Sequence, residues 1–142
     1  MKDFAKHILY VANKEKRLTN LELQMIMYFS IGEYIYENGI DKFITILYNI
    51  PFESTFHGPL IRNIHLEYKR YGRNKIKDSG IYKKEYEVLN KFIRSNIERN
   101  AFDMIRDSQK RVTWKRYKST VGRGKKRVFY NLEDIKADFH GN

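Results

Sequence analysis

The 142-residue sequence contains no cysteine, only two prolines and one tryptophan. The absence of cysteine excludes a disulfide framework, a thiolate metal site and a cysteine nucleophile. No apolar run approaches the roughly 20 residues of a membrane-spanning helix, and the first residues do not form the apolar region of a secretory signal. We therefore expect residues 1–142 to form one water-soluble domain that stays in the cytoplasm and has no membrane partner.

Acidic side chains are missing from one long stretch near the C-terminus. The chain carries 28 Lys and Arg against 17 Asp and Glu, a formal net charge of +11, and residues 109–130 hold nine of these basic side chains and no acidic one. Such a concentration of positive charge attracts nucleic acids, acidic proteins and anionic lipids without choosing among them. The candidate binding residues are therefore Lys110, Arg111, Lys115, Arg116, Lys118, Arg123, Lys125, Lys126 and Arg127.

Apolar residues recur at helical spacing through most of residues 1–108. Thr19 and Glu22 have the spacing of a capping box, which marks a helix start. Gly39 suits a left-handed helix stop, and Asn100 and Asn131 suit later helix starts. The pattern predicts helices over about 3–14, 19–38, 59–71 and 84–98, a short helix after Asn100 and a closing helix after Asn131.

Two short segments have the composition of β-strands. Residues 43–48 are mostly β-branched or aromatic, and Pro51 prevents their simple continuation. Residues 126–130 follow a predicted turn at residues 122–124 and resemble a second short strand. The predicted fold is therefore mainly α, a compact single-domain bundle of about five to six helices with a small β element.

Four short motifs follow one another along the chain. Residues 18–29 read Leu-Thr-Asn-Leu-Glu-Leu-Gln-Met-Ile-Met-Tyr-Phe, residues 56–60 Phe-His-Gly-Pro-Leu, residues 67–72 Glu-Tyr-Lys-Arg-Tyr-Gly, and residues 113–115 Thr-Trp-Lys. In order and spacing they resemble the Panacea antitoxin domain, a phage-associated, SocA-like family, over nearly the whole chain. The positions assigned to the family's structural motif are Thr19, Asn20, Leu23, Gln24, Gly58, Pro59, Tyr71, Gly72 and Trp114.

The resemblance implies a compact helical domain without known enzymatic activity. Members of the family neutralise a protein target by direct contact, or act as adaptors that deliver a protein to a protease. The sequence departs from the family at Met25 and Ile26, over residues 40–55, and before Trp114, where the usual proline is absent. These departures are typical of a diverged member with another target.

Candidate catalytic and metal-binding groups are scattered. The histidines, His7, His57, His65 and His140, do not have the spacing of a zinc site. The pairs Glu33/Glu37 and Asp103/Asp107 could bind a hard cation, although solvated helix faces explain them better. Nucleophile-elbow, P-loop and dinucleotide-binding motifs are also missing. We therefore expect no enzymatic activity, no cofactor and no metal site.

The basic stretch supports two hypotheses. The first is a phage- or prophage-encoded protein-binding module that neutralises a host toxin or defence effector, a CRISPR nuclease among the candidates, by binding a protein or ribonucleoprotein directly. The alternative is a basic phage regulator that binds RNA or DNA through residues 110–127, with phosphates on the cations and bases on the interleaved aromatic rings. A third interpretation gives the stretch no partner, with Trp114 and Phe129 in the core and the cations on a solvated face.

Overall fold

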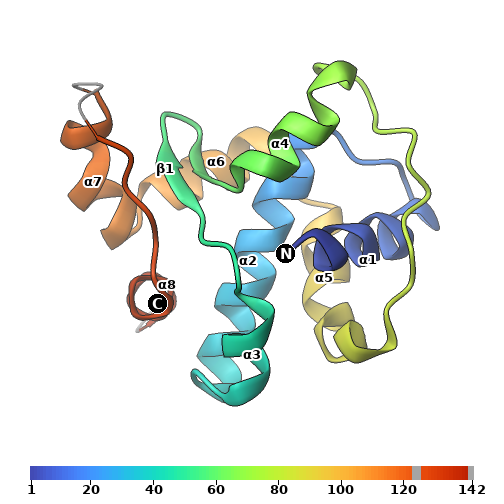
Figure 1. Ribbon diagram of the computed structural model, residues 1–142, viewed down its shortest axis with the longest axis horizontal. Coiled ribbons are helices and arrows are strands. Elements are labelled where there is room, and N and C mark those ends of the chain that lie inside the picture. The colour runs from blue at the N-terminus through green and yellow to red at the C-terminus, as the bar shows by residue number, and fades with distance from the viewer. Residues whose placement is uncertain (123–125, 141–142) are drawn as a thin grey trace.

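The computed structural model describes residues 1–122 and 126–140 and is mainly helical, with one small antiparallel sheet (Figure 1). Within these residues there are eight α-helices, more than the five to six predicted. The helices are α1 (Lys2–Asn13), α2 (Asn20–Asn38), α3 (Lys42–Leu47), α4 (Arg62–Tyr68), α5 (Asn90–Ile97), α6 (Ala101–Gln109), α7 (Val112–Gly122) and α8 (Leu132–Phe139). The strands are β1 (Glu53–Thr55) and β2 (Gly58–Leu60), and two 3₁₀ segments, η1 (Lys69–Tyr71) and η2 (Lys84–Leu89), lead out of α4 and into α5.

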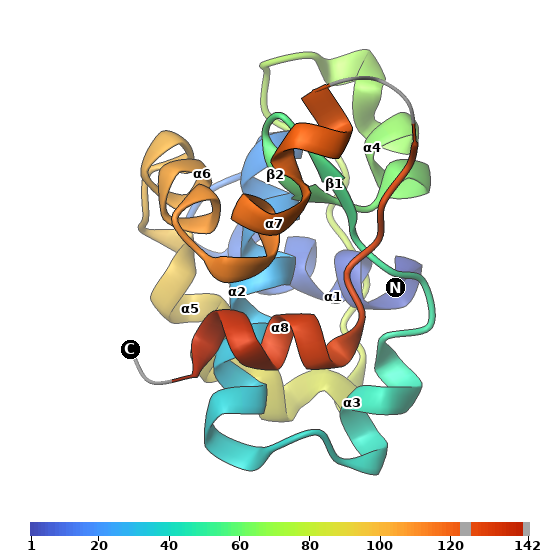
Figure 2. The ribbon, with the colours of Figure 1, turned by 90° about the vertical axis from the view of Figure 1, so that its left-hand side faces the viewer.

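Helix α2 is the central element, and most of its side chains are buried on all sides. It packs against α1, α5, α6 and α8 and against β2, and Figure 2 shows α8 crossing in front of it. The predicted capping box is confirmed: Thr19 Oγ1 accepts a hydrogen bond from the Glu22 amide at 3.2 Å, and Glu22 Oε1 accepts one from the Thr19 amide at 2.8 Å. The helix ends at Gly39, which has the positive φ of 77° expected at a helix stop.

Two further helix starts agree with the sequence. The Asn100 side chain accepts hydrogen bonds from the first amides of α6, and Asn131 and Asp134 form a reciprocal capping box at the start of α8. Each cap satisfies amides that the first helical turn leaves unpaired. These local signals therefore fix where α6 and α8 begin.

The strand predicted over residues 43–48 is wrong, because these residues form α3. Asp41 caps this helix by accepting a hydrogen bond from the Ile44 amide at 2.9 Å. Ile44 and Leu47, three residues apart, then point into the core. A short apolar run does not by itself distinguish a strand from one helical turn, and here the cap decides.

The helix predicted from Pro59 begins later, at Arg62, because residues 58–60 form β2. The Gln24 side chain accepts a hydrogen bond from the Ile61 amide at 2.8 Å and donates one to the Ile61 carbonyl at 3.2 Å. These two hydrogen bonds hold Ile61 extended, so Ile61 alone separates the end of β2 at Leu60 from the start of α4 at Arg62. Gly72 ends the helical region with a φ of 55°, as predicted.

Residues 112–122 form α7, a helix that the sequence did not predict, and α7 lies across the β-hairpin in Figure 2. Residues 126–130 run beside β1 but are not a regular strand, since their pairing is confined to a single bridge between Glu53 and Phe129. The turn predicted at residues 122–124 lies mostly outside the described residues. No helix in the described part of the chain is long and apolar enough to span a membrane.

Candidate partner-binding surface

The structure separates the predicted basic residues into two groups. Of the nine cations, Arg123 and Lys125 lie outside the described residues. Arg111, Arg116 and Arg127 each pair with a carboxylate outside the basic stretch, namely Asp107, four residues away, Asp134 and Glu53. The remaining cations, Lys110, Lys115, Lys118 and Lys126, are exposed and form no ion pair within residues 1–122 and 126–140.

The charge of the basic stretch is therefore partly neutralised in the folded chain. Acidic residues that are distant in sequence supply the compensation that the stretch itself lacks. Uncompensated positive charge, with its self-repulsion, is therefore left on the lysines and not on the three arginines. Among the lysines, Lys118 places its ammonium 5.9 Å from the centre of the Trp114 ring.

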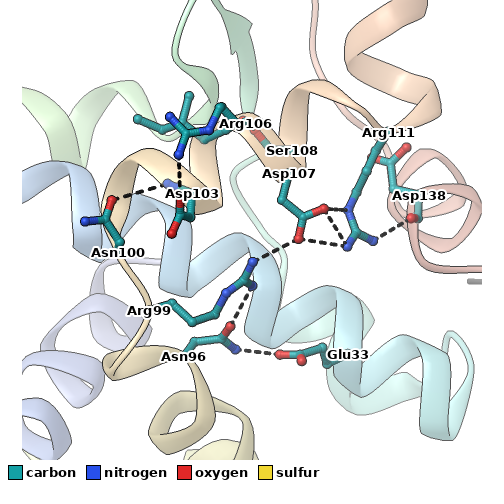
Figure 3. A network of polar contacts seen from close by, with 11 residues as sticks. Glu33, Asn96, Arg99, Asn100, Asp103, Arg106, Asp107, Ser108, Arg111 and Asp138 are labelled. Carbon is teal, nitrogen blue, oxygen red and sulfur yellow. Dashed lines mark hydrogen bonds and ion pairs between the residues drawn. The ribbon is translucent and has the colours of Figure 1, made fainter.

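Arg111 is a structural residue (Figure 3). Its guanidinium donates to both oxygens of Asp107 at 3.2 Å and to the Asp138 carbonyl at 2.7 Å. It also lies over the rings of Phe139 and Phe29, 4.2 and 5.2 Å from their centres. Arg111 thus connects the junction of α6 and α7 to α2 and α8, and only 16% of its side chain is exposed. We therefore remove it from the candidate binding residues.

Arg127 instead belongs to a cluster around a buried carboxylate. Glu53, on β1, is 8% exposed and accepts hydrogen bonds from two guanidinium groups. Arg62 donates from Nε and Nη2 at 3.0 and 2.8 Å, and Arg127 donates from the same two atoms at 3.1 and 2.8 Å. These hydrogen bonds, first from Arg62 and then from Arg127, lower the pKa of the Glu53 carboxyl from 4.5 to about 2.

The cluster keeps an excess of positive charge. Two guanidinium groups share one carboxylate, so the three side chains carry a net charge of +1 at neutral pH. Slightly more than half of each arginine side chain is exposed, 56% for Arg62 and 55% for Arg127. Each arginine uses Nε and Nη2 on Glu53, while its Nη1 donates to no group in the described part of the chain. Two oriented cations therefore face solvent.

A groove of about 380 Å³ opens beside this cluster. Three large apolar side chains on its rim are unusually exposed: Leu66 on α4 at 56%, Phe129 at 42% and Ile50 at 37%. The groove thus combines fixed guanidinium groups with apolar contact area. We call it the Glu53 groove; it is lined by Ile50, Pro51, Glu53, Arg62, Asn63, Leu66, Arg127 and Phe129.

A second hollow, of about 560 Å³, lies between α1 and the start of α5. Two of its three cations already have neighbours, because Lys14 lies over the Tyr10 ring and Lys91 pairs with Glu37. Glu87 adds a negative charge to its lining. It lacks the convergence of two guanidinium groups on one buried carboxylate, and we do not develop it as a site.

The residues of the family motif have structural roles. Asn20 donates to the His65 carbonyl at 3.0 Å, Leu23 is fully buried, and Trp114 Nε1 donates to the Thr55 carbonyl at 2.9 Å. Gly58 has a φ of 99°, and an added Cβ would lie 2.5 Å from Ser108 Oγ. The others cap, end or space elements: Thr19 and Gln24 as described above, Pro59 opposite Ser54 in the hairpin, and Tyr71 and Gly72 at the end of η1.

The histidines and acidic pairs are held by other groups. His7 contacts Asn90, His65 contacts Asn20, Glu33 accepts from Asn96, and Asp103 pairs with Arg106. His57 and His140 lie apart on the surface. Within the described residues, no group of three or more His, Asp or Glu side chains is arranged as metal ligands.

Comparison with protein-family models, with curated proteins and with solved structures found no match for this chain. The resemblance to the Panacea domain therefore remains a prediction from the four motifs. The candidate surface rests on the geometry of the groove.

Of the groove residues, only Arg127 was among the cations predicted to bind, and Phe129 was predicted only as one of the aromatic rings interleaved with those cations. Glu53, Arg62 and Leu66 were not predicted as binding residues, since Glu53 lies nine residues from Arg62 and 74 from Arg127. One local signal was present: Glu53 is the single charged residue between Lys42 and Arg62. A lone charge in an apolar segment is often buried and paired.

Proposed function

We propose that the protein is a non-enzymatic binding module that neutralises a host protein or ribonucleoprotein by covering part of its surface. The Glu53 groove supports this proposal, because arginine and aromatic side chains at the centre of a contact surface supply most of the binding energy in many complexes. The predicted family adds a phage- or prophage-encoded origin, action in the host cytoplasm, and a toxin or defence effector as target. A CRISPR nuclease is one candidate within that class.

The groove is suited to an acidic protein surface. Glu53 fixes Arg62 and Arg127 before any partner arrives, so less side-chain entropy is lost on binding. Their net positive charge favours a partner carboxylate, and Leu66 and Phe129 provide apolar area around it. The groove therefore places the charged groups that orient a partner carboxylate beside the apolar side chains that the partner would cover.

The test compares two matched pairs of substitutions. The groove variant carries Leu66→Ser and Phe129→Ser, and the control carries Ile81→Ser and Phe102→Ser, which remove similar apolar groups from exposed positions elsewhere. A host protein is first recovered by co-purification with the wild-type chain, and its affinity is then measured by calorimetry. We expect the groove variant to lose affinity at least about 30-fold, the size of a hot-spot effect, and the control to bind normally. Recovery of no partner, or equal affinities of the two variants, contradicts the proposal.

A second candidate function is nucleic-acid binding through the unpaired lysines. Lys115 and Lys118, three residues apart on α7, are exposed, and Lys110 and Lys126 add charge on either side of that helix. Such ammonium groups can replace the counterions of phosphates. Electrophoretic mobility shifts at two salt concentrations test this function: affinity should fall with a log–log slope of about −0.9 for each duplex phosphate contacted. Affinity that does not change with salt excludes it.

A further inference from the structure

Residues 127–129 form the outer edge of the small sheet. The Ser54 amide donates to the Val128 carbonyl at 2.8 Å, and the Tyr130 amide donates to the Phe52 carbonyl at 2.8 Å. These two bonds flank Phe129, which is the partner of Glu53 in the bridge. In such an antiparallel arrangement, the N–H and C=O of the residue between the bonds point away from the neighbouring strand.

Among the residues that the structure describes, the outward backbone groups of this edge have no partner. Neither the N–H nor the C=O of Phe129 bonds to another residue that the structure describes, and the same holds for Arg127, two residues earlier. Figure 2 shows this segment descending from α7 beside β1, on the side away from β2. On the inner side, the Tyr48 hydroxyl extends the pairing, since it accepts from the Phe52 amide at 2.8 Å and donates to the Tyr130 carbonyl at 2.7 Å. The inner bonds therefore hold the edge extended.

We propose that an extended, acidic segment of the partner protein adds to this edge as a further strand, with its backbone on Arg127 and Phe129. This inference rests on the proposed function and specifies how the partner is recognised. Strand addition uses backbone hydrogen bonds for affinity and side-chain contacts for specificity. Alternate side chains of the added strand lie on the same face as Arg127 and Phe129, which is the face of the Glu53 groove.

The charge on the edge selects the kind of strand. Lys126 and Arg127 are exposed, and Arg62 lines the same groove as Arg127. Positive side chains on an edge oppose pairing with a second copy of the same chain, because like charges would then face one another. They favour a strand whose side chains on that face are carboxylates, since the Nη1 atoms of Arg62 and Arg127 bond to no other described group. An acidic segment is therefore the occupant that the edge fits.

Proline substitution separates the backbone contribution from the side chain. Phe129→Ala removes the ring and keeps the outward N–H, whereas Phe129→Pro removes both. Proline is tolerated at a sheet edge where the N–H faces solvent, and neither inner hydrogen bond uses the Phe129 amide. We expect Phe129→Pro to bind the recovered host partner about fivefold more weakly than Phe129→Ala, the value of one hydrogen bond. Equal affinities, with thermal unfolding showing both variants folded, overturn the proposal.

A defined peptide tests the edge without the host partner. The probe is a blocked ten-residue peptide in which glutamate alternates with valine, and the control peptide has lysine in place of glutamate. Each peptide is titrated into the full ¹⁵N-labelled chain, and amide hydrogen exchange is followed by NMR. We expect the glutamate peptide to slow exchange at Arg127 and Phe129 at least about tenfold, because exchange requires the added strand to open, and the lysine peptide to have no effect.

Three results would contradict this proposal. They are no binding of the glutamate peptide, binding that leaves these two amides unprotected, and protection by a single-stranded oligonucleotide but not by the peptide. The last result would assign the edge to nucleic acid. The proposed function fails independently, if co-purification recovers no host protein. A recovered partner whose affinity depends on Leu66 but not on the Phe129 amide leaves the proposed function intact and removes strand addition.

Discussion

Gly32 on α2 lies directly against Phe139 on α8, so closely that an added Cβ on Gly32 would be 2.0 Å from Cε2 of the phenyl ring. The same ring packs against Tyr28 and Phe29, and the Tyr28 hydroxyl donates to Asp138 Oδ2 at 2.8 Å. A glycine in the middle of a helix costs about 1 kcal/mol relative to alanine. The close approach of α8 to the central helix explains why glycine is needed there.

Gly32→Ala should therefore destabilise the protein, although alanine is the better helix former. Overpacking of a core position costs about 1–3 kcal/mol, and the gain in helix propensity is about 1 kcal/mol. Because three ring atoms would lie within 2.3 Å of the added Cβ, we expect the upper end of that cost and a net loss of about 2 kcal/mol in urea denaturation. A smaller side chain at position 139 should relieve the clash with the added methyl group. In the double variant Gly32→Ala/Phe139→Leu the cost of alanine should shrink, and an additive result would show that Phe139 is not the cause.

Arg111 should matter for stability although it lies in the basic stretch. Arg111→Ala removes the contacts with Asp107, the Asp138 carbonyl and two phenyl rings, and leaves the half-buried Asp107 paired with Arg99 alone among the described residues. We expect a loss of about 2 kcal/mol in chemical denaturation. The control Lys115→Ala, at an exposed position without an ion pair in the described chain, should change stability by less than about 0.5 kcal/mol. Similar values for the two variants would place Arg111 among the surface cations.

The parts of the fold that were predicted correctly depend on residues close together in the chain. The caps at Thr19, Asn100 and Asn131 involve partners within three residues, so their spacing is visible in the sequence. The errors at residues 43–48 and at Pro59 have a different origin. A six-residue apolar run fits a strand or a helix, and β2 forms because it pairs with β1 and because Gln24 holds Ile61 extended.

In the candidate site, too, local features could be predicted from the sequence, whereas contacts between distant residues could not. The excess of basic residues over 109–130 was visible in the sequence, but which of them are ion-paired depends on Asp107, Asp134 and Glu53. The contact between Glu53 and Arg127 joins residues 74 positions apart. Such a contact cannot be predicted from spacing in the sequence, because Arg127 reaches Glu53 only when the folded chain runs beside β1.

His7 should make stability depend on pH. Its ring is fully buried, Nδ1 accepts a hydrogen bond from the Lys83 amide at 3.0 Å, and Nε2 lies 2.7 Å from Asn90 Oδ1. Nδ1 must be unprotonated to accept, and burial lowers the pKa of His7 below its ordinary value of 6.5. Folding thus favours the neutral ring, so this contribution to stability is complete above about pH 6.5 and decreases as the pH falls below it.

Denaturation at pH 7.5 and pH 5.5 measures this effect. His7→Gln should reduce the difference in the free energy of unfolding between the two pH values, because it removes the buried titratable ring. His65 contributes in the same direction, because burial and then the nearby Lys69 also lower its pKa. The variant His65→Gln therefore separates the two contributions. An unchanged pH dependence in His7→Gln would show that the buried ring does not couple to folding.

Glu53→Gln distinguishes oriented arginines from simple positive charge. The substitution raises the net charge by one and releases Arg62 and Arg127 from their shared carboxylate. If a protein partner needs the two guanidinium groups in fixed positions, affinity should fall about tenfold, because their order must then be established on binding. If phosphates were bound through charge alone, affinity should rise. Glu133→Gln on α8 makes the same change of charge at an exposed position and should leave protein affinity unchanged. Acid denaturation of the Glu53→Gln variant should also be less steep between about pH 4.5 and 2, since the stability that ionised Glu53 contributes is lost over that range.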